Sequence, residues 1–264
     1  MLHYDVHDGG EGPYLLLVHG FLSSRVQWTV NLAGLMAFCR PVVVELWGHG
    51  RSPTPDDPAA YSTAGYAACF EQIRAAVGAE TWFVCGQSFG AGITLNYGLT
   101  HPDRITAQVF TNSISALTPP DFESEAARAM RRQVDRIACE GLEAIRALPF
   151  HPRRARRFPE DIYLAMNQDA DAVDPAAVAL SIRETFPGLS ITERLQEIRV
   201  PTLLVNGKWE AQFQPLRHRA EEAMPALDIV DLEGGHSINI EAPDGFNAAV
   251  KAHLSRFSSR DPSA

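Results

Sequence analysis

Cysteine is scarce in this sequence, with four residues among 264. A disulfide framework uses closely spaced cysteines, and redox or metal motifs commonly use C-x-x-C. No such pair occurs among Cys39, Cys69, Cys85 and Cys139, and three of these four cysteines lie in apolar or helical contexts. The pattern is typical of reduced, buried thiols in a reducing compartment.

Long apolar runs are also missing. No stretch approaches the roughly 18 uninterrupted apolar residues that a membrane-spanning helix requires. The N-terminal sequence MLHYDVHDGGEG has neither the basic start nor the apolar segment of a secretory signal. We therefore expect a soluble cytoplasmic protein.

Basic residues are in deficit, with 23 Lys and Arg against 32 Asp and Glu, a net charge of −9 and a pI near 5.5. A protein that binds nucleic acid or anionic lipid through its charge needs the opposite balance. We expect a small-molecule substrate and neither a nucleic-acid nor a membrane partner. The sequence does not indicate an oligomeric state.

What the sequence does contain is an alternation of two kinds of segment. Short continuous apolar runs are typical of strands buried on both faces, and they occur at 13–20, 40–48, 81–87, 105–112, 201–207 and 227–235. Stretches that fit helices occur at about 24–37, 62–78, 89–100, 215–224 and 241–257. This alternation predicts an α/β fold, a mostly parallel sheet with helices on both faces, whose ligands bind at the carboxyl edge.

Ser88 lies in CGQSFGAG (85–92), directly after a predicted strand and before a predicted helix. So sharp a turn strains the backbone, and Gly86 and Gly90 avoid collisions that side chains would cause there. The turn exposes the Ser88 hydroxyl at the sheet edge beside the positively polarised first amides of the helix. The stretch therefore predicts a nucleophile next to a place for developing negative charge.

A serine nucleophile needs a base, and of nine histidines we expect His236 to serve. It follows the last predicted strand, in LEGGHSINIEAP, on a loop at the same edge as Ser88. His19 and His49 lie in glycine-containing loops after other strands. The rest lie near the N-terminus, at helix ends or within helices, where solvated imidazoles are common: His3, His7, His101, His151, His218 and His253.

The acid that orients the imidazole is predicted to be Glu210, three residues past Gly207 at the end of the strand 201–207. Asp228 and Asp231 lie in or near the strand before His236 and are expected to be structural or exposed. Asn206 is either a polar neighbour of the Glu210 loop or an ordinary turn former.

Five features stand in order at predicted strand ends: HGF (19–21), WGHGRS (47–52), GQSFG (86–90), Glu210 and GGHS (234–237). Together they resemble the α/β-hydrolase superfamily, in particular its serine-nucleophile, esterase-like branch, from about residue 13 to residue 257. The family usually has aspartate where this chain has Glu45 and Glu210, and glutamate as the triad acid is known in it.

The resemblance implies an oxyanion hole made by the backbone amides of Phe21 and Phe89. His19 would then shape the oxyanion loop rather than bind a metal, and no second imidazole stands at ligand spacing, so no metal and no cofactor are expected. The loop after the strand 40–48 is expected to be tied down by Glu45, His49, Arg51 and Ser52. The alternative is that His49 or Trp47 lines the pocket.

Serine at the elbow argues against the haloalkane dehalogenases and epoxide hydrolases of the superfamily, which carry aspartate there. It implies an acyl-enzyme and hydrolysis of an ester, thioester or lactone, or of a carbon–carbon bond in an activated diketone. The motifs also resemble those of the menaquinone-pathway lyase that eliminates pyruvate from a succinyl-cyclohexene substrate. Its elbow usually continues with an arginine where this chain has Ala91, Gly92 and Ile93. A non-catalytic small-molecule receptor is a further alternative.

Residues 113–191 interrupt the alternation, and we expect them to form a helical cap on a core made of 1–112 and 192–264. Nine arginines and three acids lie between 128 and 157. Arg153 and Arg154 are our candidates to bind a carboxylate-bearing substrate. Apolar side chains beside the motifs are expected to line a largely apolar pocket: Leu22, Trp47, Trp209, Phe213 and Ile238.

Overall fold

Seven strands form one sheet in the computed structural model, which describes residues 1–7, 12–119 and 125–258. The strand order is β1-β3-β2-β4-β5-β6-β7; β1 is antiparallel to β3, and all the other pairs are parallel. The strands are β1 His3–Val6, β2 Tyr14–Val18, β3 Arg40–Glu45, β4 Trp82–Gly86, β5 Ile105–Thr111, β6 Thr202–Gly207 and β7 Leu227–Leu232.

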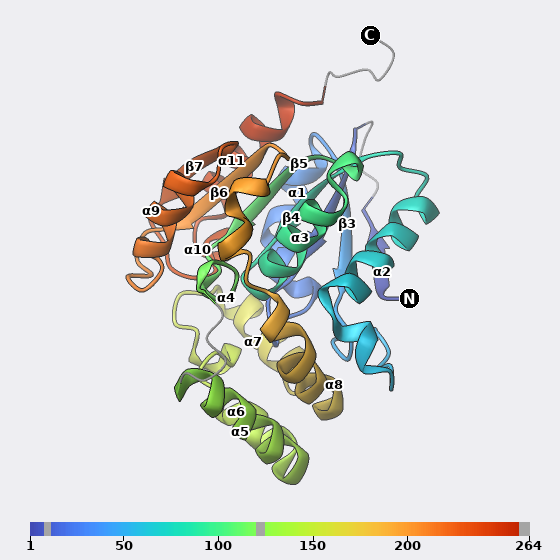
Figure 1. Cartoon of the computed structure of the whole chain (residues 1–264), viewed down its shortest axis with the longest axis vertical. Helices are drawn as coiled ribbons and strands as arrows, with labels where there is room; N and C mark the ends of the chain where they lie inside the picture. Colours follow the sequence, from blue (N-terminus) through green and yellow to red (C-terminus); the bar gives the residue numbers. More distant parts are fainter. Residues whose placement is uncertain (8–11, 120–124, 259–264) are drawn as a thin grey trace.

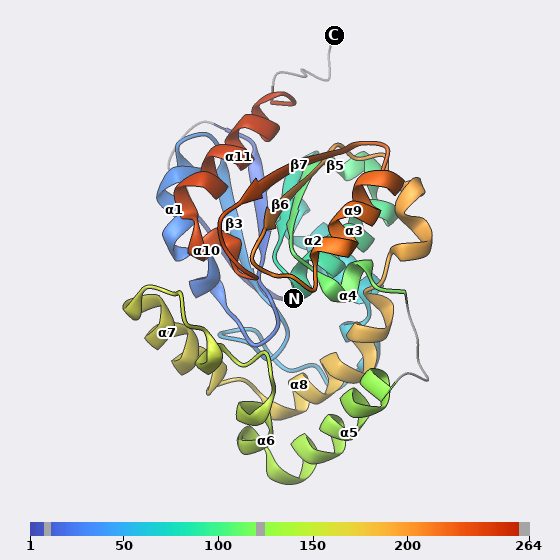
Figure 2. The ribbon, with the colours of Figure 1, turned by 90° about the vertical axis from the view of Figure 1, so that its left-hand side faces the viewer.

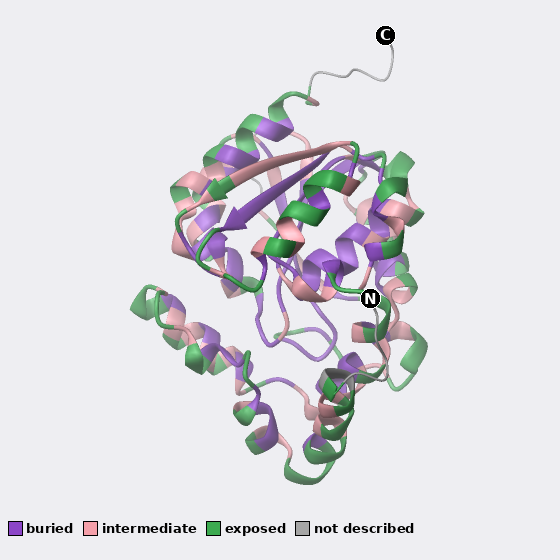
Figure 3. Ribbon diagram, turned by 60° about the vertical axis from the view of Figure 1, so that its left-hand side comes forward, coloured by how far each residue is buried: buried purple, intermediate pink, exposed green. Residues whose placement is uncertain are grey.

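The six predicted strands are all present because a strand covered on both faces needs a continuous apolar run. β4 (WFVCG) is buried throughout, and so is β2 after its first residue. Figure 3 shows the burial of the central strands. β1 is not predicted by the apolar pattern, because its residues HYDV are half-buried or exposed at the sheet edge.

Helices cover both faces of the sheet (Figures 1 and 2). On one face, side chains of α1 and α11 such as Leu35 and Phe246 pack on Leu15 and Leu17 of β2. On the other face α2 and α3 pack on the alternate strand residues, and α9 packs on the same side near β5 and β6. These helices are α1 Thr29–Met36, α2 Thr63–Ala76, α3 Phe89–Thr100, α9 Gln214–Ala223 and α11 Pro243–Ser255.

The segment between β5 and β6 is largely helical, and its helices α5, α6, α7 and α8 lie beyond one end of the sheet, in the lower part of Figures 1 and 2. It contains α4 Ile114–Leu117, α5 Glu125–Glu140, α6 Leu142–Ala147, α7 Glu160–Ala170 and α8 Pro175–Leu180. Several of its apolar side chains form a hydrophobic cluster with Leu22: Ile137, Ile145, Leu148, Val173, Val178 and Ile182.

Shorter turns of helix complete the described structure. They are 3₁₀ turns at Arg25–Trp28, Pro58–Tyr61, Pro102–Arg104, Pro152–Arg154, Phe186–Gly188 and Thr192–Glu197, a π-helical turn at Ser181–Thr185, and α10 Ile238–Glu241. None of the described helices is long and apolar enough to span a bilayer. All four cysteines are free; Cys139 is exposed, and the other three are buried.

Candidate active site

Ser88 stands on the turn between β4 and α3 with φ 52° and ψ −111°, a left-handed conformation that a side chain adopts only under strain. Its glycine neighbours are required by close backbone contacts. A Cβ on Gly86 would lie 2.6 Å from the Ala91 Cα, and one on Gly90 would lie 2.4 Å from the Val18 carbonyl oxygen. The turn therefore depends on both glycines.

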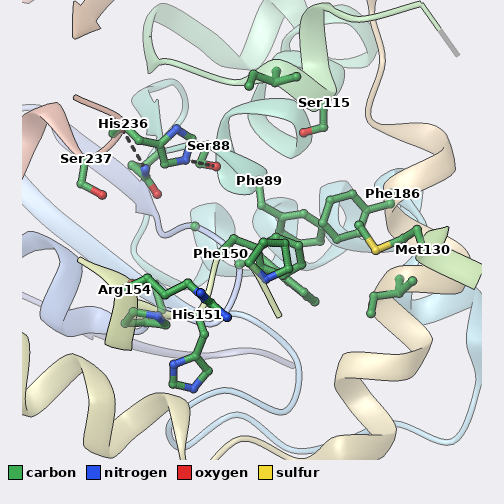
Figure 4. A pocket seen from close by; sticks show the side chains of 18 of the residues that line it. Ser88, Phe89, Ser115, Met130, Phe150, His151, Arg154, Phe186, His236 and Ser237 are labelled. Atoms are coloured by element: carbon green, nitrogen blue, oxygen red, sulfur yellow. Dashed lines mark hydrogen bonds between the residues drawn. The ribbon is translucent and has the colours of Figure 1, made fainter. Parts of the chain in front are cut away.

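Three side chains from distant parts of the sequence meet at this turn. The Ser88 Oγ lies 2.7 Å from the His236 Nε2, and the His236 Nδ1 lies 2.9 Å from the Glu210 Oε1. Figure 4 shows His236 directed at Ser88. Ser88 follows β4, Glu210 follows β6 and His236 follows β7, so the parallel sheet brings all three to one edge.

The position of the proton on the His236 ring follows from Glu210, the acceptor at the end of this hydrogen-bonded series. An ionised carboxylate only accepts, so the His236 Nδ1 carries the proton that Glu210 binds. In a neutral imidazole with this proton, the Nε2 is the acceptor for the Ser88 hydroxyl. This is the tautomer in which an imidazole can take a proton from serine.

Glu210 is held ionised in spite of its burial. Burial alone would raise its pKa, but the hydrogen bond and charge of His236, together with a hydrogen bond from Asn112, lower the pKa below its usual value. The Asn112 Nδ2 donates to the Glu210 Oε2 over 2.8 Å. Asn112 also pairs with the backbone of Gly207, accepting from its N–H at 2.9 Å and donating to its carbonyl at 3.0 Å.

His19 joins the loops that follow β2 and β3. Its Nδ1 lies 2.7 Å from the Gly20 carbonyl oxygen, and its Nε2 accepts from the Leu46 N–H over 3.0 Å. Burial and the neighbouring His49 lower the pKa of His19 to about 3, although the bond to Gly20 favours the proton. His19 is therefore a neutral, fully hydrogen-bonded link between backbone segments.

The loop after β3 is tied down through the buried carboxylate of Glu45. The Arg25 Nη1 and the Arg51 Nε each lie 2.9 Å from one of its oxygens. The Ser52 hydroxyl donates to the Glu45 carbonyl, and the His49 Nδ1 lies 2.8 Å from the Trp47 carbonyl oxygen. These contacts agree with the structural interpretation of this motif, and neither His49 nor Trp47 lines the cavity described next.

A cavity of about 1720 Å³ opens above Ser88. Its walls come from the loops after β2, β4, β6 and β7 and from the segment between β5 and β6. Sites for small molecules usually enclose about 300–1,000 Å³, so this one could hold a bulky ligand or solvent beside a small one.

An aromatic cluster forms the wall nearest to Ser88 (Figure 4). The Phe21 ring centroid lies 5.0 Å from those of Phe89 and Phe186 and 5.5 Å from that of Phe150. Phe89 and Phe186 are 4.8 Å apart. Phe89 is the first residue of α3, so its N–H belongs to the positively polarised helix start.

Charged side chains occupy other parts of the cavity wall. Five arginines contribute to it: Arg131, Arg154, Arg156, Arg157 and Arg183. In Figure 4, Arg154 lies apart from the Phe89 and Phe186 rings, on the side of Phe150. The cavity wall therefore combines aromatic rings with several arginine side chains.

A protein family described as alpha/beta hydrolase fold matches residues 13–243. The chain belongs to the α/β-hydrolase fold family. This match covers strands β2 to β7, the three hydrogen-bonded side chains and the helical segment between β5 and β6.

Individual α/β-hydrolase relatives have several names. A putative 2-succinyl-6-hydroxy-2,4-cyclohexadiene-1-carboxylate synthase of Bacillus subtilis is 26% identical, over 96% of this chain and 95% of that protein. A carboxylesterase of the same species is also 26% identical, over 92% and 81%. A putative carbamate hydrolase of Caulobacter is 28% identical, over 96% of each chain.

Solved structures share the fold of this α/β-hydrolase. MenH from S. aureus superposes with a TM-score of 0.85 at 20% identity, covering 97% of this chain and 99% of that one. An enol-lactonase from Burkholderia xenovorans superposes with a TM-score of 0.82 at 20% identity, covering 96% of each chain.

The prediction that certain apolar side chains line the pocket is wrong for five residues. Four of them point into hydrophobic clusters and are not part of the cavity wall: Leu22, Trp47, Phe213 and Ile238. Trp209 lies outside the cavity and is half-exposed, with its Nε1 donating to the Glu233 Oε2 over 2.8 Å. Nearness to a motif in the sequence does not determine the direction of a side chain.

The two arginines predicted to bind a carboxylate are separated by the structure. Arg154 lines the cavity, whereas Arg153 is not part of its wall. Both side chains reach carbonyl oxygens at the end of α6: the Arg153 Nη1 lies 3.3 Å from that of Arg146, and the Arg154 Nε lies 3.3 Å from that of Leu148.

Sequence reasoning missed Asn112, Phe150 and Phe186. Asn112 ends a predicted strand at the same edge as Ser88, so its position in the sequence could have identified it as a neighbour of the site. Phe150 and Phe186 lie in the segment between β5 and β6, where no periodic pattern shows which side chains face the sheet.

Proposed function

We propose that this protein is a serine hydrolase that cleaves an ester-type bond through an acyl-enzyme, with Ser88, His236 and Glu210 as its triad. One observation carries the proposal. The Ser88 Oγ, the imidazole of His236 and the carboxylate of Glu210 form a continuous hydrogen-bonded series, with separations of 2.7 and 2.9 Å, at the floor of a large cavity.

In the first half of the reaction the Ser88 oxygen attacks the carbonyl carbon while the His236 Nε2 takes the hydroxyl proton. Negative charge develops on the carbonyl oxygen, and the N–H groups of Phe21 and Phe89 are the proposed donors to it. Glu210 stabilises the imidazolium that forms. His236 then protonates the leaving group, the ester bond breaks, and the acyl group remains on Ser88.

In the second half water replaces the leaving group. The His236 Nε2 takes a proton from the water, whose oxygen attacks the acyl carbon, and the bond to Ser88 breaks as the proton returns to the serine oxygen. The products are a carboxylic acid and the free enzyme. An ester, a thioester or a lactone fits this sequence of steps.

The segment between β5 and β6 acts in this proposal as a cap, residues 113–191, that selects the substrate. It contributes Phe150 and Phe186 to the aromatic wall and Arg154 to the basic part of the cavity. The substrate class that fits is a small, largely apolar ester, and a carboxylate on it could be bound by Arg154.

Labelling of Ser88 tests the proposal. A fluorophosphonate probe should modify Ser88, and short-chain p-nitrophenyl esters should be hydrolysed. Ser88→Ala should abolish labelling and lower kcat by at least about a thousandfold, because the nucleophile is lost. Ser255→Ala, at the far end of α11, is the matched control. A wild-type protein that is neither labelled nor active on any ester, thioester or lactone would refute the proposal.

The second candidate is a lyase that eliminates pyruvate from a succinyl-cyclohexene substrate. It is favoured by the similarity over 96% of this chain to the Bacillus subtilis synthase and by the arginines of the cavity. Incubation with that substrate, followed by an assay for pyruvate, tests this candidate, and release of pyruvate would support it. Absence of pyruvate, with esterase activity present, removes this candidate.

A further inference from the structure

The loops that carry the acid and the imidazole run side by side at the carboxyl edge of the sheet. We call residues 208–213 the acid loop and residues 233–237 the histidine loop. Their backbones are joined by a hydrogen bond of 2.8 Å from the Trp209 N–H to the Gly234 carbonyl oxygen. Because of this bond, a displacement of one loop also disturbs the other.

The side chain of Arg157, from the segment between β5 and β6, contacts the acid loop directly and the histidine loop through Glu241. Its guanidinium carbon lies 5.2 Å from the centroid of the Trp209 ring, which is next to Glu210 in the sequence. Its Nη1 lies 3.4 Å from the Glu241 Oε2. That same carboxylate oxygen accepts from the N–H of Gly235 over 2.9 Å, and Gly235 is the residue before the imidazole.

Burial makes Glu241 sensitive to its partners. Its side chain is 7% exposed, whereas that of Arg157 is 50% exposed and also lines the cavity. A carboxylate with so little access to water needs a counter-charge and hydrogen-bond donors. Without Arg157, Glu241 would gain by turning toward solvent, and the Gly235 N–H would lose its acceptor.

We propose that Arg157 is a positioning residue that holds the acid loop and the histidine loop in register for proton transfer. It stacks on Trp209 of the first loop and, through Glu241, fixes the backbone of the second. Contact with the cap segment is thereby coupled to the alignment of the imidazole with Ser88. The consequence for the reaction rests on the proposed function, whereas the effect on the loops does not.

Amide hydrogen exchange of the full-length protein without substrate tests the effect on the loops. Arg157→Leu should raise exchange in peptides covering 208–213 and 233–237 by about tenfold, since both contacts are lost. Arg153→Leu is the matched control, because Arg153 is a nearby exposed arginine outside the cavity. Equal exchange in the two variants would overturn the proposal.

Arg157→Lys separates a specific contact from a general loss of structure. Lysine keeps the charge that pairs with Glu241 but lacks the planar group that stacks on Trp209. It should restore protection of the histidine loop more fully than that of the acid loop. If Lys restores neither loop, the ion pair is not what holds them, and the proposal fails.

Kinetics then test the consequence for catalysis. With a neutral ester, Arg157→Leu should lower kcat and the rate of fluorophosphonate labelling by about tenfold at nearly constant KM, since small misalignments slow proton transfer. Arg153→Leu should stay within about twofold of wild type on these measures. Unchanged kcat and labelling in Arg157→Leu would overturn the proposal. A wild-type protein without labelling or turnover would refute the proposed function instead, and the exchange comparison would still decide on Arg157.

Discussion

The Ser88–His236 hydrogen bond depends on the carboxylate of Glu210, which binds the other nitrogen of the imidazole. Glu210 accepts from both His236 and Asn112, and these bonds outweigh the effect of burial and lower its pKa. An ionised Glu210 favours the tautomer of His236 with a proton on Nδ1, and in the proposed reaction it stabilises the imidazolium. The longer side chain of glutamate, where the family usually has aspartate, still places its oxygen 2.9 Å from the Nδ1.

Replacing Glu210 by glutamine tests this arrangement. Glu210→Gln removes the charge and offers a donor as well as an acceptor to the imidazole, so kcat should fall by at least about a hundredfold. Asp231→Asn is the matched control, because Asp231 pairs with Arg217 and Asn206 instead. Steady-state kinetics with a p-nitrophenyl ester measures both. A loss below about fivefold for Glu210→Gln would mean that another acid serves His236.

The short turn Pro152–Arg154 carries two adjacent arginines, of which one borders the cavity and the other does not. Arg154 faces the cavity, with its Nε and Nη2 at 3.3 and 3.4 Å from the carbonyl oxygens of Leu148 and Ala147. Arg153 is not part of the cavity wall, and its Nη1 lies 3.3 Å from the Arg146 carbonyl oxygen. The turn therefore contributes one of its two guanidinium groups to the cavity wall.

Comparing these neighbours tests carboxylate binding. Arg154→Ala should raise KM for an ester that carries a free carboxylate by about tenfold, the cost of one charge-assisted hydrogen bond, and change KM for the neutral analogue much less. Arg153→Ala should affect neither substrate. Equal effects of Arg154→Ala on both substrates would show that this guanidinium does not bind the carboxylate.

The helical segment between β5 and β6 is the element about which the sequence was least informative. Its composition indicated helices and excess arginine, but not which side chains meet the sheet. Phe150 and Phe186 reach the Phe21 ring only because this segment folds back over the carboxyl ends of the strands.

For the molecule as a whole, buried imidazoles link stability to pH. Burial lowers the pKa of His49, and burial with His49 lowers that of His19 to about 3, so both bind a proton less readily in the folded protein than in the unfolded chain. The unfolded chain protonates each histidine as pH falls below its usual pKa near 6.5. The unfolded state then binds more protons, so the free energy of unfolding decreases as the pH falls.

We predict that the free energy of unfolding depends more steeply on pH in the wild type than in His19→Gln. Between about pH 6 and pH 4, the slope of the free energy of unfolding should be smaller in the variant by up to about 1.4 kcal/mol per pH unit, the contribution of one proton. Urea denaturation at a series of pH values measures it. Equal slopes would show that His19 is protonated to the same extent in both states.

The layered fold could be predicted from the amino-acid sequence, and so could the meeting of the three residues of the candidate triad at one edge of the sheet. Strands buried on both faces must be continuously apolar, and a parallel sheet brings the residues after its strands to one edge. Ser88, Glu210 and His236 could therefore be placed together without coordinates. The edge strand β1 was not predicted, because it pairs with one strand and is little buried, so its sequence need not be apolar.

The directions of individual side chains depend on the tertiary structure and could not be predicted from the sequence. Trp47 and Phe213 turn into the core and Trp209 outward, although all three adjoin motif residues. Asn112 and Arg157 owe their contacts to segments far away in the chain, with Glu210 and Glu241 as partners. Residue type and local spacing carry the periodicity of a strand or helix, whereas the direction of a loop side chain is set by the packing of elements that meet only in the folded molecule.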